Sequence, residues 1–184
     1  MEEGISNRRK HLRLPTFPYT HGAFFITLVT QDRRCIFGDI VDGVLQATML
    51  GRIVEREWEV TGRIRCEVSL QAFVLMPNHM HAVVVLEPGM SNEDRGRPPV
   101  APTAAERARG SGARSLGALV AGYKSAVTRA AKETGIDVPG GKIWQRNYYE
   151  HVIRDEKDWN AIIAYIEDNP RAWAEDAENP DRTG

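Results

Sequence analysis

The sequence predicts an α+β fold in which helices cover one face of an antiparallel sheet. Its 184 residues suit a single domain with a sizeable core. Hydrophobic residues make up 42% and charged residues 27% of the chain, which excludes wholesale disorder and fibrous classes. The predicted elements follow in the order β-α-β-β-α-β-α, with a hairpin at the centre. This order is that of a ferredoxin-like sandwich followed by one more helix.

Three strands and one helix are predicted in the first half of the chain. Residues 23–30 are β-branched and aromatic, which is typical of a strand. Apolar residues from 44 to 60 recur near the helical period and predict a helix. Residues 66–75 and 79–86 predict two strands, and the short break at 76–78 predicts that they pair as a hairpin.

The second half contributes two helices and the fourth strand. A helix is expected over 115–133, with the serine at its start as cap. Residues 143–153 are rich in aromatic side chains and predict a strand. A final helix is expected over 155–168, capped by its first aspartate and ended by the Asn-Pro pair at 169–170.

Charge is unevenly distributed along a chain whose formal net charge is only -1. Ten Lys and Arg residues stand against three acidic ones in 95–146, and from 150 onward ten acidic residues stand against four basic ones. We therefore expect one domain over 1–184, with a basic arm at 1–18, a flexible basic loop at 87–114 and an acidic tail at 174–184. This asymmetry is compatible with a face that binds a polyanion, and equally with ordinary solvated surfaces.

Targeting features are not evident. No apolar run is long enough to span a bilayer, and the N-terminus lacks the apolar stretch of a secretory signal. The two cysteines are too few for a disulfide framework. We expect a cytoplasmic protein, nucleoid-associated when bound to DNA, with no membrane partner.

His79-Met80-His81 is the sharpest local feature. On a strand, residues two apart point to the same face, so the two imidazoles could bind one divalent cation with a third ligand from another element. The alternative is a pair of packed strand histidines without a metal.

Tyr165 and Asn169 are four residues apart near the end of the last predicted helix, so they share one helical face. An activated tyrosine can attack a phosphodiester, and an amide oxygen suits a hard cation such as Mg²⁺. Alternatively, the tyrosine is a packing residue.

An aromatic and basic stretch covers residues 144–153. Aromatic rings can stack on unpaired bases while Arg binds phosphate, although alternating aromatics also pack sheets. Trp144 is expected in the core, and Arg146 and one of the tyrosines at 148 and 149 are expected in contact with a ligand. Glu150 and His151 are candidates for support of the site.

Taken together, these segments resemble the HUH-type single-tyrosine DNA transposases, in the branch of the REP-associated tyrosine transposases. The resemblance runs from about Arg8 to Trp173. It rests on six segments in order: RRK with LRL near the N-terminus, FIT followed by QDRRCIFG, FVLMPNHMH, SLGALVAGYK, WQRNYYEH and YIEDNP.

The resemblance implies a metal-dependent enzyme that cleaves and rejoins single-stranded or hairpin DNA through a 5′-phosphotyrosine. Tyr165 matches the nucleophile, and His79, His81 and Asn169 match the ligands of a divalent metal, Mg²⁺ or Mn²⁺. The expected DNA contacts are Arg8, Arg9, Lys10, Arg13, Lys124, Gln145, Arg146, Tyr148 and Tyr149.

Two other functions stay open at this point. One is a domesticated, non-catalytic protein that binds DNA or RNA hairpins on the same fold; the intact histidine, tyrosine and asparagine set argues against it. The other is a metal-dependent phosphodiesterase that uses water as the nucleophile. The DNA target and the choice between monomer and homodimer are left undecided.

Overall fold

The computed structural model describes residues 20–87 and 114–182. The predicted basic arm and nearly all of the predicted 87–114 loop lie outside this part of the chain. Within the described residues, no helix is both long and apolar enough to cross a membrane.

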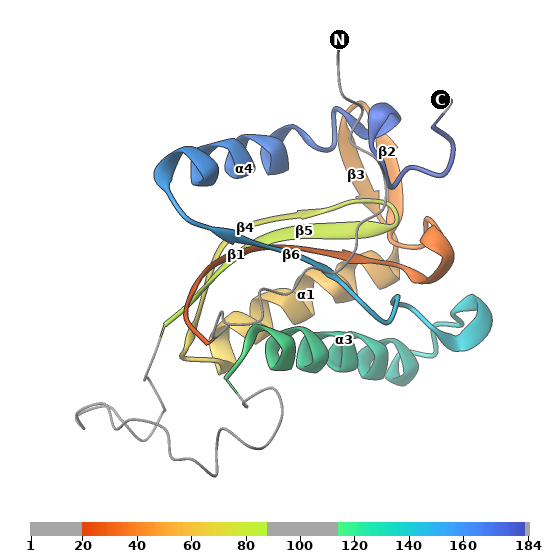
Figure 1. Ribbon diagram of the computed structural model, residues 1–184. Coiled ribbons are helices and arrows are strands. Elements are labelled where there is room, and N and C mark those ends of the chain that lie inside the picture. Colours follow the sequence, from red (N-terminus) through yellow and green to blue (C-terminus); the bar gives the residue numbers. More distant parts are fainter. Residues whose placement is uncertain (1–19, 88–113, 183–184) are drawn as a thin grey trace.

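A four-stranded antiparallel sheet forms the centre of the molecule (Figure 1). Its strands are β1 (Gly22–Val29), β4 (Val68–Leu75), β5 (His79–Leu86) and β6 (Tyr149–Ile153), in the spatial order β4-β5-β1-β6. β4 and β5 form the predicted hairpin, and β1 lies between β5 and β6. The predicted ferredoxin-like α+β class is confirmed.

Helices cover both faces of this sheet rather than one. Figure 1 shows α1 (Met49–Ile64) and α3 (Leu116–Glu133) on one face and α4 (Glu156–Asp168) on the other. The strands are apolar on both faces: Phe24 packs with the main core, whereas Phe25 packs with Ile166 of α4. A sheet that is apolar on both faces must be covered on both, because exposed apolar surface is unfavourable.

The helix expected over 44–60 begins later than predicted. Residues 38–47 instead form a hairpin of β2 (Gly38–Val41) and β3 (Val44–Ala47), separate from the main sheet. Asp42 and Gly43 connect its strands with φ values of 51° and 75°, as a two-residue hairpin turn requires. Helix α1 then begins after Thr48, whose side chain accepts a hydrogen bond from the backbone N–H of Gly51.

The strand expected over 143–153 is interrupted. Only β6 is continuous strand, and Trp144 forms an isolated bridge with Thr30 beyond the end of β1. The predicted caps of the other two helices are confirmed, with Ser115 before α3 and Asp155 before α4. In the described part of the chain, three short 3₁₀ helices complete the elements: η1 (Gln31–Arg33), η2 (Pro139–Gly141) and η3 (Trp173–Glu175).

Candidate metal and tyrosine site

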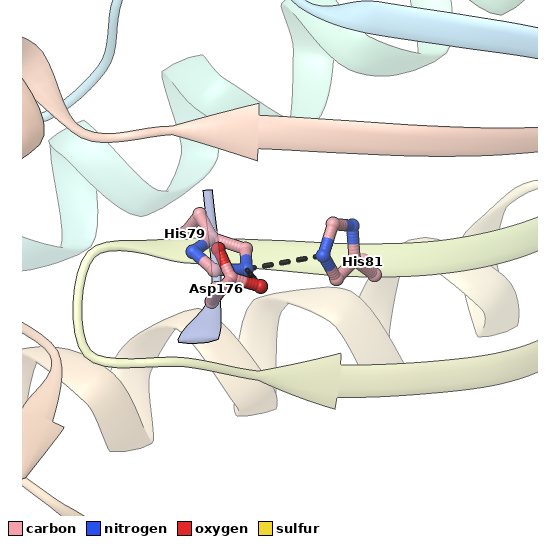
Figure 2. A group of neighbouring side chains, drawn as sticks. All are labelled: His79, His81 and Asp176. Atoms are coloured by element: carbon pink, nitrogen blue, oxygen red, sulfur yellow. Dashed lines mark hydrogen bonds and ion pairs between the residues drawn. The ribbon is translucent and has the colours of Figure 1, made fainter. Parts of the chain in front are cut away.

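The two histidines of β5 lie on the sheet face that α4 covers. Strand alternation places Met80 on the opposite face, where it is fully buried in the main core. His79 is 0% and His81 2% exposed, and their Nε2 atoms lie 3.1 Å apart (Figure 2). The structure therefore brings the predicted histidine pair together at one point.

Asn78 fixes the orientation of His79. Its Nδ2 donates to the backbone carbonyls of Arg33 and Glu178, at 3.0 and 2.6 Å. The Asn78 Oδ1 then lies 2.8 Å from Nδ1 of His79 and accepts a hydrogen bond from it. The Nε2 atom of His79, which faces Nε2 of His81, is then the ring nitrogen that can bind a metal.

His81 is held by the neighbouring strand. Thr27 stands directly opposite it on β1, and the threonine Oγ1 lies 2.8 Å from Nδ1 of His81. Phe25, on the same face, stacks on the His81 ring with centroids 5.2 Å apart. These contacts orient the His81 Nε2 toward His79 and away from the sheet.

Asp176 completes a group that could hold a metal ion. It follows η3, is 9% exposed, and its Oδ2 lies 4.0 Å from Nε2 of His79 (Figure 2). The ligand atoms of the three residues all lie within 4.8 Å of one another. Adjacent ligands on an octahedral cation, each about 2.1 Å from it, lie about 3 Å apart, so the spacing of the histidines fits such an ion.

Asn169, the predicted third ligand, lies beside this group. It is 2% exposed, and its Nδ2 donates to Oδ2 of Asp176 at 3.4 Å. Its Oδ1 is buried and has no hydrogen-bond partner among the described residues. A buried oxygen without a hydrogen-bond partner is rare and can serve as a ligand of a cation. Two imidazoles, a carboxylate and an amide oxygen together form a set of ligands that fits a divalent metal.

Tyr165 reaches the same point from α4. Its hydroxyl lies 3.2 Å from Nε2 of His81, and its ring meets the Phe25 ring edge-on at 6.1 Å. At 45% exposure the side chain is open to solvent and is the only exposed large hydrophobic side chain described on α4. The structure thus brings the predicted nucleophile next to the predicted ligands.

The two candidates for site support differ in placement. His151 pairs with Phe25 on the site face, and its Nε2 lies 2.8 Å from Oδ2 of Asp158 on α4. That contact, chiefly the hydrogen bond, holds the pKa of Asp158 below its usual value. Glu150 pairs with Ile26, a residue of the main core, so the Glu150 side chain leaves β6 on the face opposite the site.

The predicted DNA contacts are only partly brought together. Tyr149 lies beside the site, with its ring 6.1 Å from that of Phe25, whereas Tyr148 packs against the main core. Arg146 is exposed, and Gln145 hydrogen-bonds through its backbone N–H to Val29. Four predicted contacts lie outside the described residues: Arg8, Arg9, Lys10 and Arg13.

The Nζ of Lys124, a further predicted DNA contact, donates instead to two backbone carbonyls, those of Gln145 and Asn147. The sequence interpretation also missed Asp176, Thr27 and Asn78. Pairing of the two predicted strands could have identified Thr27 as the residue opposite His81. No local pattern marks Asp176, which lies nearly a hundred residues from His79 in the sequence.

Comparisons with known proteins show what the chain is similar to. No family model matches it. A protein of Haemophilus influenzae, described as uncharacterized, is 34% identical over 176 residues, which cover 94% of this chain and 93% of that protein. The two belong to one family. The solved structure of a REP-associated tyrosine transposase bound to a REP hairpin is 21% identical, with a TM-score of 0.54, over 94% of this chain and 74% of the other.

The chain has the fold of a REP-associated tyrosine transposase. The transposase fold agrees with the central antiparallel sheet and the three helices described above.

Proposed function

We propose that this protein is a metal-dependent transposase that cleaves and rejoins single-stranded or hairpin DNA. Tyr165 is the nucleophile, and His79 and His81, with Asn169 and Asp176, hold the divalent metal. The catalytic domain extends over the whole chain, and the basic arm and the 87–114 loop contact the DNA. The structural neighbour, whose own DNA is a REP hairpin, supports this choice of substrate class.

One observation carries the proposal: the hydroxyl of Tyr165 lies 3.2 Å from Nε2 of His81, which is one of the three side chains that could hold a metal ion. A packing tyrosine would bury its ring, whereas Tyr165 is 45% exposed and can meet a strand from solvent. A hairpin-binding protein without catalysis has no need of this arrangement.

The residues account for the chemistry as follows. The Tyr165 oxygen attacks the phosphorus, the bond from phosphorus to the 3′-oxygen breaks, and a 5′-phosphotyrosine and a free 3′-OH result. The tyrosine proton leaves to solvent and the departing 3′-oxygen takes one up. A bound divalent cation would neutralise charge on the scissile phosphate and orient it for in-line attack. Rejoining reverses these steps, so no nucleotide cofactor is consumed.

The experiment is incubation of the full chain with hairpin DNA and Mg²⁺ or Mn²⁺, followed by a denaturing gel. We expect a protein-DNA adduct that resists denaturation and that does not form when EDTA is present from the start. Cleavage without an adduct would indicate a phosphodiesterase that uses water. Binding without cleavage would indicate the non-catalytic hairpin-binding protein.

A further inference from the structure

The segment that pairs with the end of β1 is two residues longer than the segment it faces. Thr27 pairs with Tyr149, and Thr30 forms its bridge with Trp144. Two residues separate the paired positions on β1, whereas four, residues 145–148, separate them on the partner. The extra length must leave the sheet as a bulge, a feature that re-aims side chains and occurs often next to functional sites.

Lys124 of α3 holds this bulge through hydrogen bonds to its backbone. Its Nζ donates to the carbonyl oxygens of Gln145 and Asn147, at 2.9 and 3.0 Å, and lies 5.9 Å from the centre of the Tyr148 ring. Burial lowers the pKa of Lys124 to about 8. A partly buried lysine that directs two of its three donors to backbone carbonyls is poorly placed to neutralise a phosphate.

The bulge leads directly to the candidate site. Tyr149 follows it, and the Tyr149 ring meets Phe25, which stacks on His81. Arg146 and Asn147, at the bulge, are both exposed. A guanidinium displayed there can bind the backbone of a strand that enters the site.

We propose that Lys124 is a positioning residue: it fixes the 145–148 bulge so that Arg146 binds a phosphate of the DNA strand, and it does not bind phosphate itself. The part that concerns DNA rests on the proposed function. The part that concerns the bulge does not, and the two are tested separately.

The first test needs no DNA and measures amide hydrogen exchange over residues 145–149 in the full chain. Lys124→Met should speed this exchange about tenfold, the effect of one or two lost hydrogen bonds, and Arg146→Gln should leave it unchanged. Lys124→Arg, which restores N–H donors, should return the exchange toward the wild-type rate and serves if the Met variant does not fold. Wild-type exchange in a folded Lys124→Met variant would overturn the proposal.

The second test measures hairpin affinity against salt concentration for both single variants and the double variant. Loss of one phosphate contact reduces the salt slope by about 0.7 for a single strand. Arg146→Gln should show this reduction, and adding Lys124→Met should reduce the slope no further. A further reduction of about 0.7 in the double variant would make Lys124 a phosphate contact and overturn the proposal.

The two failures are distinguishable. If the wild-type chain does not bind the hairpin, the proposed function fails, while the exchange measurement still decides whether Lys124 holds the bulge. If the wild-type chain binds the hairpin but the exchange of Lys124→Met is that of the wild type, the inference about Lys124 fails and the proposed function stands.

Discussion

At the scale of single residues, the site depends on which nitrogen each histidine presents. Asn78 Oδ1 accepts a hydrogen bond from Nδ1 of His79, so Nε2 is the nitrogen that His79 turns toward His81. The Thr27 hydroxyl restrains His81 from the neighbouring strand through its 2.8 Å contact with Nδ1. Both rings are therefore oriented with their Nε2 atoms toward one point, which limits the cost of ordering the site.

The histidine pair gives the first prediction. His79→Ala or His81→Ala should abolish metal-dependent cleavage, because each removes one of two converging ligands. Hairpin affinity should stay within about tenfold, or 1.4 kcal/mol, since basic residues elsewhere supply the phosphate contacts. Calorimetry with Mn²⁺ measures the metal directly. Normal Mn²⁺ binding by the double variant would contradict the ligand assignment.

Asp176 gives the second prediction. Asp176→Asn removes the carboxylate from the donor group and should weaken Mn²⁺ binding about tenfold or more. Asn169→Ala should weaken it less, because a neutral amide contributes less attraction than a charged oxygen. Asp181→Asn, which removes an exposed acid of the same tail, is the matched control. Equal Mn²⁺ affinity for Asp176→Asn and the control would leave Asn169 as the third ligand.

At the scale of elements, α4 must hold Tyr165 against β5. Phe25, Val83 and Ile166 form the small core beneath the helix. Its first turn is joined to β6 by the contact of His151 with Asp158. The helix is thus fixed at its start by polar contacts and along its length by apolar ones, while Tyr165 stays open near its end.

The contact between His151 and Asp158 gives the third prediction. The lowered pKa of Asp158 means that its carboxylate stabilises the fold at pH above its unfolded value, and that this stabilisation is lost as the pH falls through the still lower folded value. Asp158→Asn should therefore be less stable than the wild type at pH 7, and the difference should shrink below about pH 4.

Urea unfolding from pH 7 to pH 3 measures this effect. Glu156→Gln removes an exposed acid from the same turn of α4 and is the control, because it lies outside the contact with His151. A stability difference for Asp158→Asn that does not change with pH, or that Glu156→Gln shares, would mean that the charge of Asp158 adds nothing specific to the anchoring of α4.

Most elements could be predicted from the sequence because their ends carry local signals. Ser115, Asp155 and the Asn-Pro pair at 169–170 mark helix ends through their own side chains and dihedral preferences. The β2–β3 hairpin was missed because Leu45 and Met49 also fit a helical period, although the Asp42-Gly43 pair is a hairpin turn signal. The bulge at 145–148 depends on register with β1, which no local pattern encodes.

At the scale of the whole molecule, the site joins distant parts of the chain. β5 supplies the histidines, α4 the tyrosine, and the segment after η3 the aspartate. His79-Met80-His81 and Tyr165 could be predicted because their residue types signal chemistry. Asp176 could not, since only the folded chain brings the acidic tail to β5. Glu178 of that tail also pairs with Arg33 at 2.8 Å, so the tail is not a free appendage.

The basic arm gives the fourth prediction. If Arg8, Arg9 and Lys10 neutralise phosphates, deletion of residues 1–13 should weaken hairpin binding and reduce the salt slope by about 0.7 per lost contact. Chemistry at saturating DNA should persist, because the deletion spares every residue of the site. An unchanged slope would mean that these residues only solvate the surface, and that DNA binding depends on the 87–114 loop and the residues around Arg146.

The central claim is that Tyr165 becomes covalently attached to DNA. The most direct measurement is mass spectrometry of the proteolysed adduct from the wild-type chain, with Tyr165→Phe as the control. The substitution removes one oxygen and keeps the ring contact with Phe25, so the fold should change little. We predict a nucleotide-modified peptide that carries the phosphate on Tyr165 and no adduct in Tyr165→Phe. An adduct in Tyr165→Phe, or phosphate mapped to Tyr148, Tyr149 or Tyr123, would contradict the account.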